Sequence, residues 1–339
     1  RALGDAVLRA LDAPIQVNSG SLRLSISVGA IRSRPDETPE SLLRDADVAL
    51  YRAKDLGRNR LVWFDAELRE QALRRLAIVN DHRAALANGE LTWLYQPEVD
   101  LASGKTIGFE ALARWHHPVW GDIPPSEFVP IIDSSGGGPT LFETALHAAL
   151  SLQARWKRQY GETIVVSVNL SPRILDDQNL IDLVDQALRR HGGPPAMLWL
   201  EVTEDALAEP RHLQLLTEIR RLGVKLAIDD FGTGWASIAR LTGSRWNLLK
   251  IDRSFIQAIG TTPEADSVVQ AMIGLAHTFD VRVAAEGVET VEQLEWLAAA
   301  GCDLVQGYLL GAPGTPDALP DLVGQSALLI QGSRSEKAG

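Results

Sequence analysis

The chain is poor in cysteine and has no long apolar segment. Its one cysteine, Cys302, permits no internal disulfide and fits a reducing compartment. An uninterrupted apolar run of about 18 residues, which a membrane-spanning helix needs, is missing from the sequence. We therefore expect a cytoplasmic protein, with any membrane anchor lying upstream of this chain.

Basic residues are also in short supply. Lys and Arg number 33 against 44 Asp and Glu, which gives a formal net charge of −11. A surface of this sign opposes binding of a nucleic-acid polymer, which needs a basic face. A small anionic substrate can still bind an acidic site when metal ions lie between them.

The length of 339 residues predicts about two domains. The first 65 residues contain two helical and two strand patterns, which are too few for an independent core. We interpret residues 1–65 as the C-terminal part of an α/β domain, with helices expected at 3–11 and 39–56 and strands at 22–31 and 59–65. Residues 66–88 have helical spacing up to Asn88-Gly89 and predict a connecting helix. The polar residues 326–339 predict a disordered tail.

Residues 89–325 predict a (β/α)8 TIM-like barrel, because strand-like runs recur with amphipathic helices between them. The eight runs lie at 92–99, 107–115, 163–170, 196–202, 224–230, 246–252, 281–287 and 303–310. Only the seven residues 100–106 join the first two runs, and a parallel crossover needs a dozen or more. The first strand is therefore expected to be antiparallel to its neighbours.

Every predicted strand carries a polar residue near its end, where the strands of a barrel converge on one pocket. These residues are Gln96, Glu110, Asn169, Glu201, Asp229 with Asp230, Lys250 with Asp252, Glu286 and Gln306. Carboxylate and amide oxygens without His or Cys suit Mg²⁺ or Mn²⁺. Their number favours two ions, the usual device for in-line attack on a phosphodiester. Lys250 can hold the attacking water, and Arg114, on the same strand face as Glu110, can clamp a phosphate.

The motifs of this segment resemble those of EAL domains, which are cyclic di-GMP phosphodiesterases with a barrel whose first strand is antiparallel. The matching stretches are YQPEVDL, EALARWHHP, VNLS, LEVTE, AIDDFGTG, LKIDRSF, AEGVET and QGYLL, in the family's order. The resemblance implies hydrolysis of cyclic di-GMP to linear pGpG with two Mg²⁺ or Mn²⁺ ions and inhibition by Ca²⁺. It also implies a homodimer formed through the barrel.

The resemblance further implies a role for each site residue. Glu110, Asn169, Glu201 and Asp229 would hold one metal, and Asp229, Asp230 and Glu286 the other. Lys250 and Glu286 would orient or deprotonate the water, and the sequence leaves open which is the base. Substrate contacts would come from Gln96, Leu112, Arg114, Asp252 and Gln306. Glu204 would tie down the DDFGTG loop, and Glu289 would support it.

Residues 45–65, DADVALYRAKDLGRNRLVWFD, resemble the C-terminal end of GGDEF diguanylate cyclase domains. The loop that binds metal and catalyses condensation in that family is absent from this chain. We therefore expect no cyclase activity here, and we expect GGDEF or sensory domains upstream in the full-length protein.

Two departures from the EAL pattern stand out. Trp235-Ala236-Ser237 replaces the family's Tyr-Ser-Ser after DDFGTG, and 131–138, IIDSSGGG, predicts a mobile loop. Neither departure removes a ligand. The alternative function is a non-catalytic cyclic di-GMP receptor, whose usual sign is the loss of a ligand or of the catalytic lysine. An enolase-like metal-dependent lyase is a third hypothesis, which the complete motif set disfavours.

Overall fold

The computed structural model describes residues 2–11, 13–17, 20–33, 37–234 and 246–324, and these divide into two compact units after Asp81. Each unit is described by itself. Among the helices in these ranges, none combines the length and the apolar character of a membrane-spanning segment. The expected tail at 326–339 and the stretch Trp235-Ala236-Ser237 lie outside the described residues.

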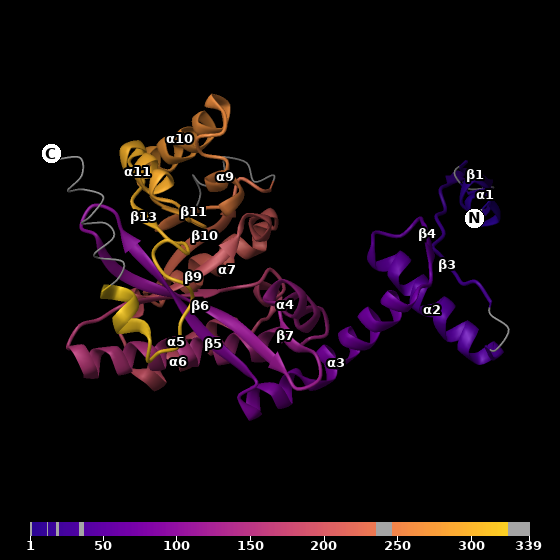
Figure 1. The fold of residues 1–339 in the computed structure, drawn as a ribbon, viewed down its shortest axis with the longest axis horizontal. Helices are drawn as coiled ribbons and strands as arrows, with labels where there is room; N and C mark the ends of the chain where they lie inside the picture. Colours follow the sequence, from indigo (N-terminus) through magenta and orange to yellow (C-terminus); the bar gives the residue numbers. More distant parts are fainter. Residues whose placement is uncertain (1, 12, 18–19, 34–36, 235–245, 325–339) are drawn as a thin grey trace. The chain divides into compact units, whose positions relative to one another are not determined.

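The first unit is a small α/β assembly (Figure 1). Its elements are α1 (Ala2–Arg9), β1 (Ile15–Val17), β2 (Gly20–Leu22), β3 (Val28–Ala30), α2 (Pro39–Asp55), β4 (Leu61–Trp63) and the first part of α3 (Ala66–Asn88). The strand expected at 22–31 is interrupted, because Leu22 ends β2 and only Val28–Ala30 form β3, which pairs in parallel with β4. Helix α2 lies directly on β3, because a Cβ atom at Gly29 would come within 2.2 Å of the Ala46 carbonyl oxygen. Helix α3 covers the range predicted for a helix.

The second unit is an eight-stranded closed barrel, as the sequence predicts. Its strands in chain order are β5 (Leu91–Asp100), β6 (Lys105–His117), β8 (Val165–Asn169), β9 (Leu198–Thr203), β10 (Lys225–Phe231), β11 (Leu248–Ile251), β12 (Arg282–Ala285) and β13 (Leu304–Val305). Strands β6 and β8 to β13 pair in parallel in chain order, and β5 closes the ring between β13 and β6. The (β/α)8 TIM-like barrel predicted from the eight apolar runs is confirmed.

Strand β5 is antiparallel to both of its neighbours, which confirms the predicted reversal. The two strands β5 and β6 lie side by side, and all of β5 is covered by the pairing, which runs along β6 from Lys105 to Trp115 (Figure 1). The short strand β7 (Gly121–Ile123) extends the end of β6 as an antiparallel addition. The hairpin register sets Gln96 opposite Glu110, so two predicted site residues face each other across it.

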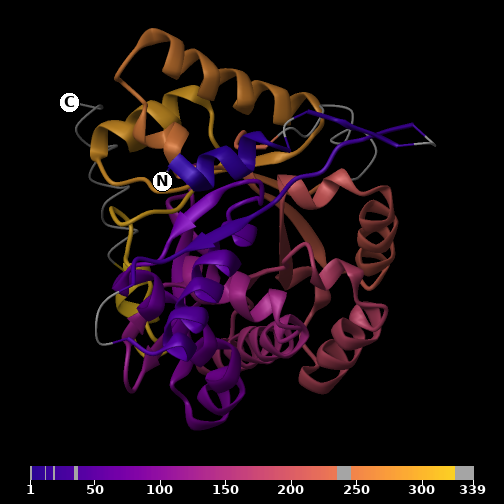
Figure 2. The same ribbon diagram turned by 90° about the vertical axis from the view of Figure 1, so that its right-hand side faces the viewer.

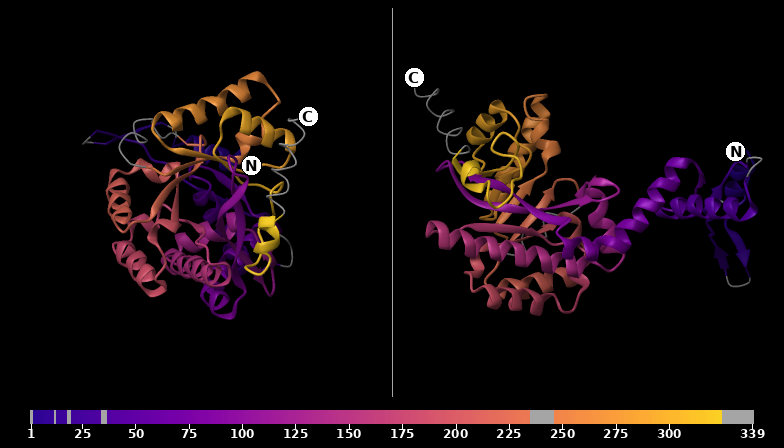
Figure 3. Two further views of the ribbon diagram at one scale, coloured as in Figure 1. Left: turned by 90° about the vertical axis from the view of Figure 1, so that its left-hand side faces the viewer. Right: turned by 60° about the horizontal axis from the view of Figure 1, so that its bottom comes forward.

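Helices form the outer layer around the strands (Figures 2 and 3). The principal ones are α4 (Pro125–Ser134), α5 (Gly138–Tyr160), α6 (Leu180–His191), α7 (Pro210–Arg221), α10 (Pro263–Thr278) and α11 (Val291–Ala300). Apolar residues of the outward strand faces, such as Phe109, Val166 and Leu200, are fully buried against these helices. The inward faces are thereby left to carry the polar residues.

The loop predicted at 131–138 is wrong in its extent. Ile131 to Ser134 belong to α4, and Gly138 begins α5, so only three residues connect the helices. Gly136 adopts a φ of 85°, and a Cβ atom at Gly138 would come within 2.2 Å of Asp133 Oδ1. The glycines therefore allow a tight, closely packed helix–helix turn.

Candidate active site

Strand register brings the predicted polar residues into one layer inside the barrel. Asn169 at the end of β8 pairs with Glu201 on β9, and Gln96 pairs with Glu110 on the β5–β6 hairpin. Alternate residues of a strand face the same side, so these side chains share the interior. All of them except Asn169 are buried.

Lys250 on β11 is the hub of this layer. Its side chain has no solvent exposure, and its Nζ lies 2.9 Å from Glu201 Oε2 and 2.5 Å from Glu286 Oε1. The same atom lies 3.2 Å from Glu110 Oε2 and 3.7 Å from Asp229 Oδ1. One ammonium is thus shared by four carboxylates, which leaves the cavity with excess negative charge.

Amide side chains fix the orientation of the Glu110 carboxylate. Asn169 Nδ2 donates to Glu110 Oε1 at 2.7 Å, and Gln306 Nε2 donates to Glu110 Oε2 at 2.7 Å. Gln306 also donates to Gln96 Oε1 at 3.1 Å, while Gln96 donates to the Gly311 carbonyl at 3.1 Å. Because Asn169 contacts Glu110 through its nitrogen, its side-chain oxygen, the atom that can bind a cation, takes no part in that hydrogen bond.

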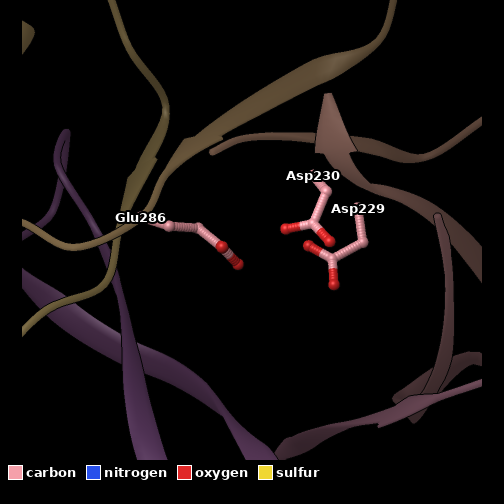
Figure 4. Close-up of side chains that lie close together, drawn as sticks. All are labelled: Asp229, Asp230 and Glu286. Carbon is pink, nitrogen blue, oxygen red and sulfur yellow. The ribbon is translucent and has the colours of Figure 1, made fainter. Parts of the chain in front are cut away.

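Asp229 and Asp230 both face the cavity because β10 is irregular. Neighbouring residues of a regular strand point to opposite faces. The β10–β11 register shifts between Ile228 and Phe231, and Asp230 adopts a φ of 53°. As a result, carboxylate oxygens of Asp229, Asp230 and Glu286 lie within 4.8 Å of one another. Figure 4 shows the three side chains turned toward a common space inside the ring of strands.

Burial favours the protonated, neutral form of the carboxyl groups in this layer, whereas nearby positive charge and hydrogen bonds favour the ionised form. Desolvation raises the pKa of Glu201 and of Glu286 well above its usual value, because the Lys250 charge compensates only in part. Burial and then the Asp229 charge raise the pKa of Asp230 to about 6. Burial also opposes ionisation of Glu110, but Lys250 and the hydrogen bonds from Gln306 and Asn169 outweigh it and lower its pKa.

The donor set fits a divalent cation. Glu201 Oε1, Asp229 Oδ1 and Gln306 Oε1 are buried without a hydrogen bond in the described structure. Buried oxygens left in this state carry a desolvation cost that a bound cation removes. Since the unpaired atoms are all oxygens, the site suits a hard ion such as Mg²⁺ or Mn²⁺.

The remaining predicted residues lie around this layer. Glu204 Oε2 accepts from the N–H groups of Gly232 at 2.9 Å and Gly234 at 3.3 Å, the loop that follows Asp230. Asp252 caps α9 (Arg253–Gln257) by accepting from the Ser254 N–H at 3.0 Å. Its charge nevertheless contributes to the raised pKa of Asp230.

Arg114 and Glu289 are not brought into the carboxylate layer. Arg114 Nη1 donates to the Ala113 carbonyl at 2.8 Å, and the side chain lines a separate hollow with Thr92 and His116. Glu289 is exposed, and only its N–H has a hydrogen bond among the described residues, to Gln293 Oε1 at 2.8 Å.

A cavity of about 740 Å³ adjoins the carboxylates. Asn169 and Asp230 lie on its border, and Leu112 forms part of a largely apolar wall with Trp93 and Phe142. The sequence reasoning missed Asp133, a carboxylate on this wall whose pKa burial raises. It sits in the stretch that was interpreted as a loop.

The sequence reasoning also missed Glu98. This side chain is buried on β5, and Ser167 Oγ donates to it at 3.3 Å. Burial raises its pKa to about 7. The signal was available, because Glu98 is two residues from Gln96 and shares its face of the strand.

Family models match most of the chain. The model described as EAL domain matches residues 79–313, and the model described as diguanylate cyclase, GGDEF domain, matches residues 2–60.

Among curated proteins, two similar relatives are from Pseudomonas aeruginosa. The bifunctional diguanylate cyclase/cyclic di-GMP phosphodiesterase MucR is 35% identical over 92% of this chain and 46% of its own length. The cyclic di-GMP phosphodiesterase NbdA is 36% identical over 92% of this chain and 40% of its own length. The chain thus spans less than half of each relative.

Solved structures of the same kind superpose well. The PaMucR phosphodiesterase in complex with c-di-GMP has a TM-score of 0.69 at 36% identity and covers 71% of this chain and 99% of that one. The EAL enzyme Bd1971 bound to cAMP and cyclic di-GMP has a TM-score of 0.70 at 29% identity and covers 85% of this chain and 77% of that one.

Proposed function

Because the chain belongs to the EAL-domain family, we propose that it is a metal-dependent phosphodiesterase that hydrolyses cyclic di-GMP to linear pGpG in second-messenger signalling. The observation that carries this proposal is the convergence of Glu110, Glu201, Asp229 and Glu286 on one buried lysine. The cyclic di-GMP phosphodiesterase activity named for two relatives supports it.

The proposed metal ligands are those that the resemblance to the family implies, and the grouping of Asp229, Asp230 and Glu286 supports one of the two sets. Glu110, Asn169, Glu201 and Asp229 would hold one ion, and Asp229, Asp230 and Glu286 a second, with Mg²⁺ or Mn²⁺ suited to both positions. Bound there, two such ions supply activation of water and neutralisation of charge on the phosphate. Ca²⁺ would inhibit, because it prefers a larger and looser coordination shell.

Within the pair left open by the sequence, Glu286 is the better candidate for the base. Burial opposes the charge on Lys250, but the carboxylates around it outweigh that effect and raise its pKa, so the ammonium keeps its proton at neutral pH. It can therefore orient a water or stabilise negative charge by donating hydrogen bonds. Glu286, a carboxyl group that lies beside Asp229 and Asp230, is the member of the pair that can accept a proton when it is ionised.

Substrate would bind at the mouth of the barrel. Gln96 and Gln306 lie beside Glu110, and Leu112 offers an apolar surface on which a base can pack. The cavity of about 740 Å³ has the size and the apolar character of a small-molecule site. Arg114 would contact a phosphate and Asp252 a base of the substrate. Both side chains would have to move from their present contacts to do so.

The partners of the chain are part of the proposal. A homodimer through the barrel, with GGDEF or sensory domains upstream in the full-length protein, would connect hydrolysis to a signal. The partial GGDEF match supports a GGDEF domain upstream.

A direct assay tests the proposed function. The purified chain with cyclic di-GMP and Mn²⁺ should release pGpG, detected by anion-exchange chromatography. Glu110→Ala should abolish this release, whereas Glu162→Ala, an exposed carboxylate after α5, should leave it unchanged. Tight binding of cyclic di-GMP in Ca²⁺ without turnover in Mg²⁺ or Mn²⁺ would instead assign the chain as a receptor.

A further inference from the structure

Two histidines meet between helices α5 and α6 on the outside of the barrel. His147 Nδ1 lies 3.0 Å from His191 Nε2, and the ring centroids are 5.2 Å apart at an angle of 44°. The opposite nitrogen of His147, Nε2, lies 3.9 Å from Glu143 Oε1, one helical turn earlier on α5. None of these residues touches the carboxylate layer in any contact described above.

The spacing of the two facing nitrogens suits a shared metal ion. Zinc–imidazole bonds are about 2.0–2.1 Å long, so two nitrogens on one ion at angles of about 95–110° are about 3.0–3.4 Å apart. In a structure without the ion, the same spacing is that of an N–H···N hydrogen bond between a donor and an acceptor ring. That hydrogen bond needs a proton on one of the two facing nitrogens, whereas a shared metal needs both of them deprotonated, so metal binding requires the donor ring to carry its proton on the other nitrogen.

Glu143 adds the carboxylate that accompanies many metal-binding histidines. A ligating imidazole commonly donates its other N–H to a carboxylate, which fixes the tautomer and the ring orientation. With His147 Nδ1 facing His191, Nε2 is left on the side of Glu143, whose carboxylate at 3.9 Å is within ion-pair distance and must move closer to accept a hydrogen bond. The His147 side chain is 29% exposed, so an ion and its water ligands can reach the pair from solvent.

We propose that His147 and His191 form a second metal site, in which His147 Nδ1 and His191 Nε2 bind Zn²⁺, Cu²⁺ or Ni²⁺ and Glu143 orients His147. Imidazole nitrogen selects these ions over Mg²⁺, so the site differs in chemistry from the oxygen-lined active site. Because His191 is the last residue of α6 and His147 lies within α5, a bound ion would link the two helices.

Cu²⁺ electron paramagnetic resonance tests this proposal, because nitrogen ligands split the signal and oxygen ligands do not. The metal-free chain with one equivalent of Cu²⁺ should show superhyperfine structure from two nitrogens. His147→Gln and His191→Gln should each remove this two-nitrogen pattern and weaken Cu²⁺ binding at the site at least tenfold. Glu143→Gln should retain the pattern and weaken binding by a smaller factor.

Matched controls separate this pair from other histidines. His277 also contacts a carboxylate, Asp303 at 2.9 Å, but no second histidine is among its described contacts, so His277→Gln should change nothing. Far-ultraviolet circular dichroism should confirm that each variant is folded. A spectrum without splitting from two nitrogens, or one that His147→Gln and His191→Gln leave intact, would overturn the proposal. Neither result depends on whether the chain hydrolyses cyclic di-GMP.

Discussion

Lys250 Nζ lies 2.9 Å from Glu201 Oε2, and both side chains have no solvent exposure. A buried ion pair of this kind gains little over an apolar pair, yet removal of one partner is costly. Here the lysine also contacts Glu286 and Glu110, so its single positive charge is shared among three carboxyl groups and the cavity has a deficit of positive charge. That deficit is the physical basis for the proposed metal binding.

Replacing the lysine should damage both activity and stability. Lys250→Met is expected to lower kcat by about 100-fold or more, as for loss of one electrostatic stabiliser of a transition state. In the presence of a chelator it should also lower the free energy of unfolding by about 3 kcal/mol, because Glu201 loses its buried partner. Urea denaturation and turnover assays measure the two effects. Lys225→Met, at the start of β10, should show neither, and an equally unaffected Lys250→Met would contradict this assignment.

The backbone at Asp230 should tolerate asparagine better than alanine. Its φ of 53° lies in the left-handed region, which costs an ordinary residue about 1–2 kcal/mol and asparagine less. The free energy of unfolding of Asp230→Ala should therefore be about 1 kcal/mol lower than that of Asp230→Asn. Both variants lose the metal-binding charge. Asp280 is exposed and has a similar φ of 59°. Asp280→Ala and Asp280→Asn therefore form a matched pair of variants away from the site and should show the same difference. Equal stabilities of the Ala and Asn variants at Asp230 would show that the backbone is not strained there.

Glu204 should control the loop that follows Asp230. Its carboxylate accepts two backbone hydrogen bonds, and hydrogen bonds to a charged group contribute about 1.5–3 kcal/mol each. Glu204→Ala is expected to weaken Mn²⁺ binding by about 10- to 100-fold through disorder of the loop. Glu204→Gln, which keeps one acceptor oxygen, should weaken it less. Calorimetric titration with Mn²⁺ measures both variants. Glu209→Ala, at an exposed position, is the control and should leave the Mn²⁺ affinity unchanged. The same unchanged affinity in Glu204→Ala would show that this loop does not affect metal binding.

Glu98 should make stability depend on pH. Burial raises the pKa of this carboxyl from 4.5 to about 7, so the folded chain holds a proton that the unfolded chain releases at lower pH. Stability from this group is therefore lost as pH rises from about 4.5 to about 7, by about 3 kcal/mol at most. Glu98→Gln should remove that loss, and its advantage over the parent should grow across the same interval. Chemical denaturation at pH 5 and pH 8 in a chelator measures it. A difference that stays constant with pH, as expected for exposed Glu162→Gln, would refute the shift.

Periodicity in the sequence was enough to predict the barrel and its reversed first strand. Apolar runs with helices between them predict a closed parallel sheet, and the seven-residue link at 100–106 is too short for a crossover. The convergence of strand ends on one pocket also placed Glu110, Asn169 and Glu201 in one interior layer. These features depend on regular strands, for which residue parity is a reliable guide.

Irregular backbone is where the sequence was a poorer guide. Asp230 faces the cavity only because of a positive φ and a register shift, which strand parity does not anticipate. Glu98 lies near the end of β5, but this strand is reversed, so that its end runs away from the layer of Glu110: Gln96 is opposite Glu110, and Glu98 is opposite Gly108. The tight turn after α4 looked like a loop because three glycines favour flexibility when their packing partners, such as Asp133, are unknown.

Anomalous diffraction from crystals grown with Mn²⁺ and cyclic di-GMP tests the proposed metal site most directly. We predict two peaks about 3.5–4 Å apart. One should be bordered by Glu110, Asn169, Glu201 and Asp229, and the other by Asp229, Asp230 and Glu286. A map without a peak at these carboxylates, with Lys250 still in contact with Glu201 and Glu286, would contradict the two-metal account.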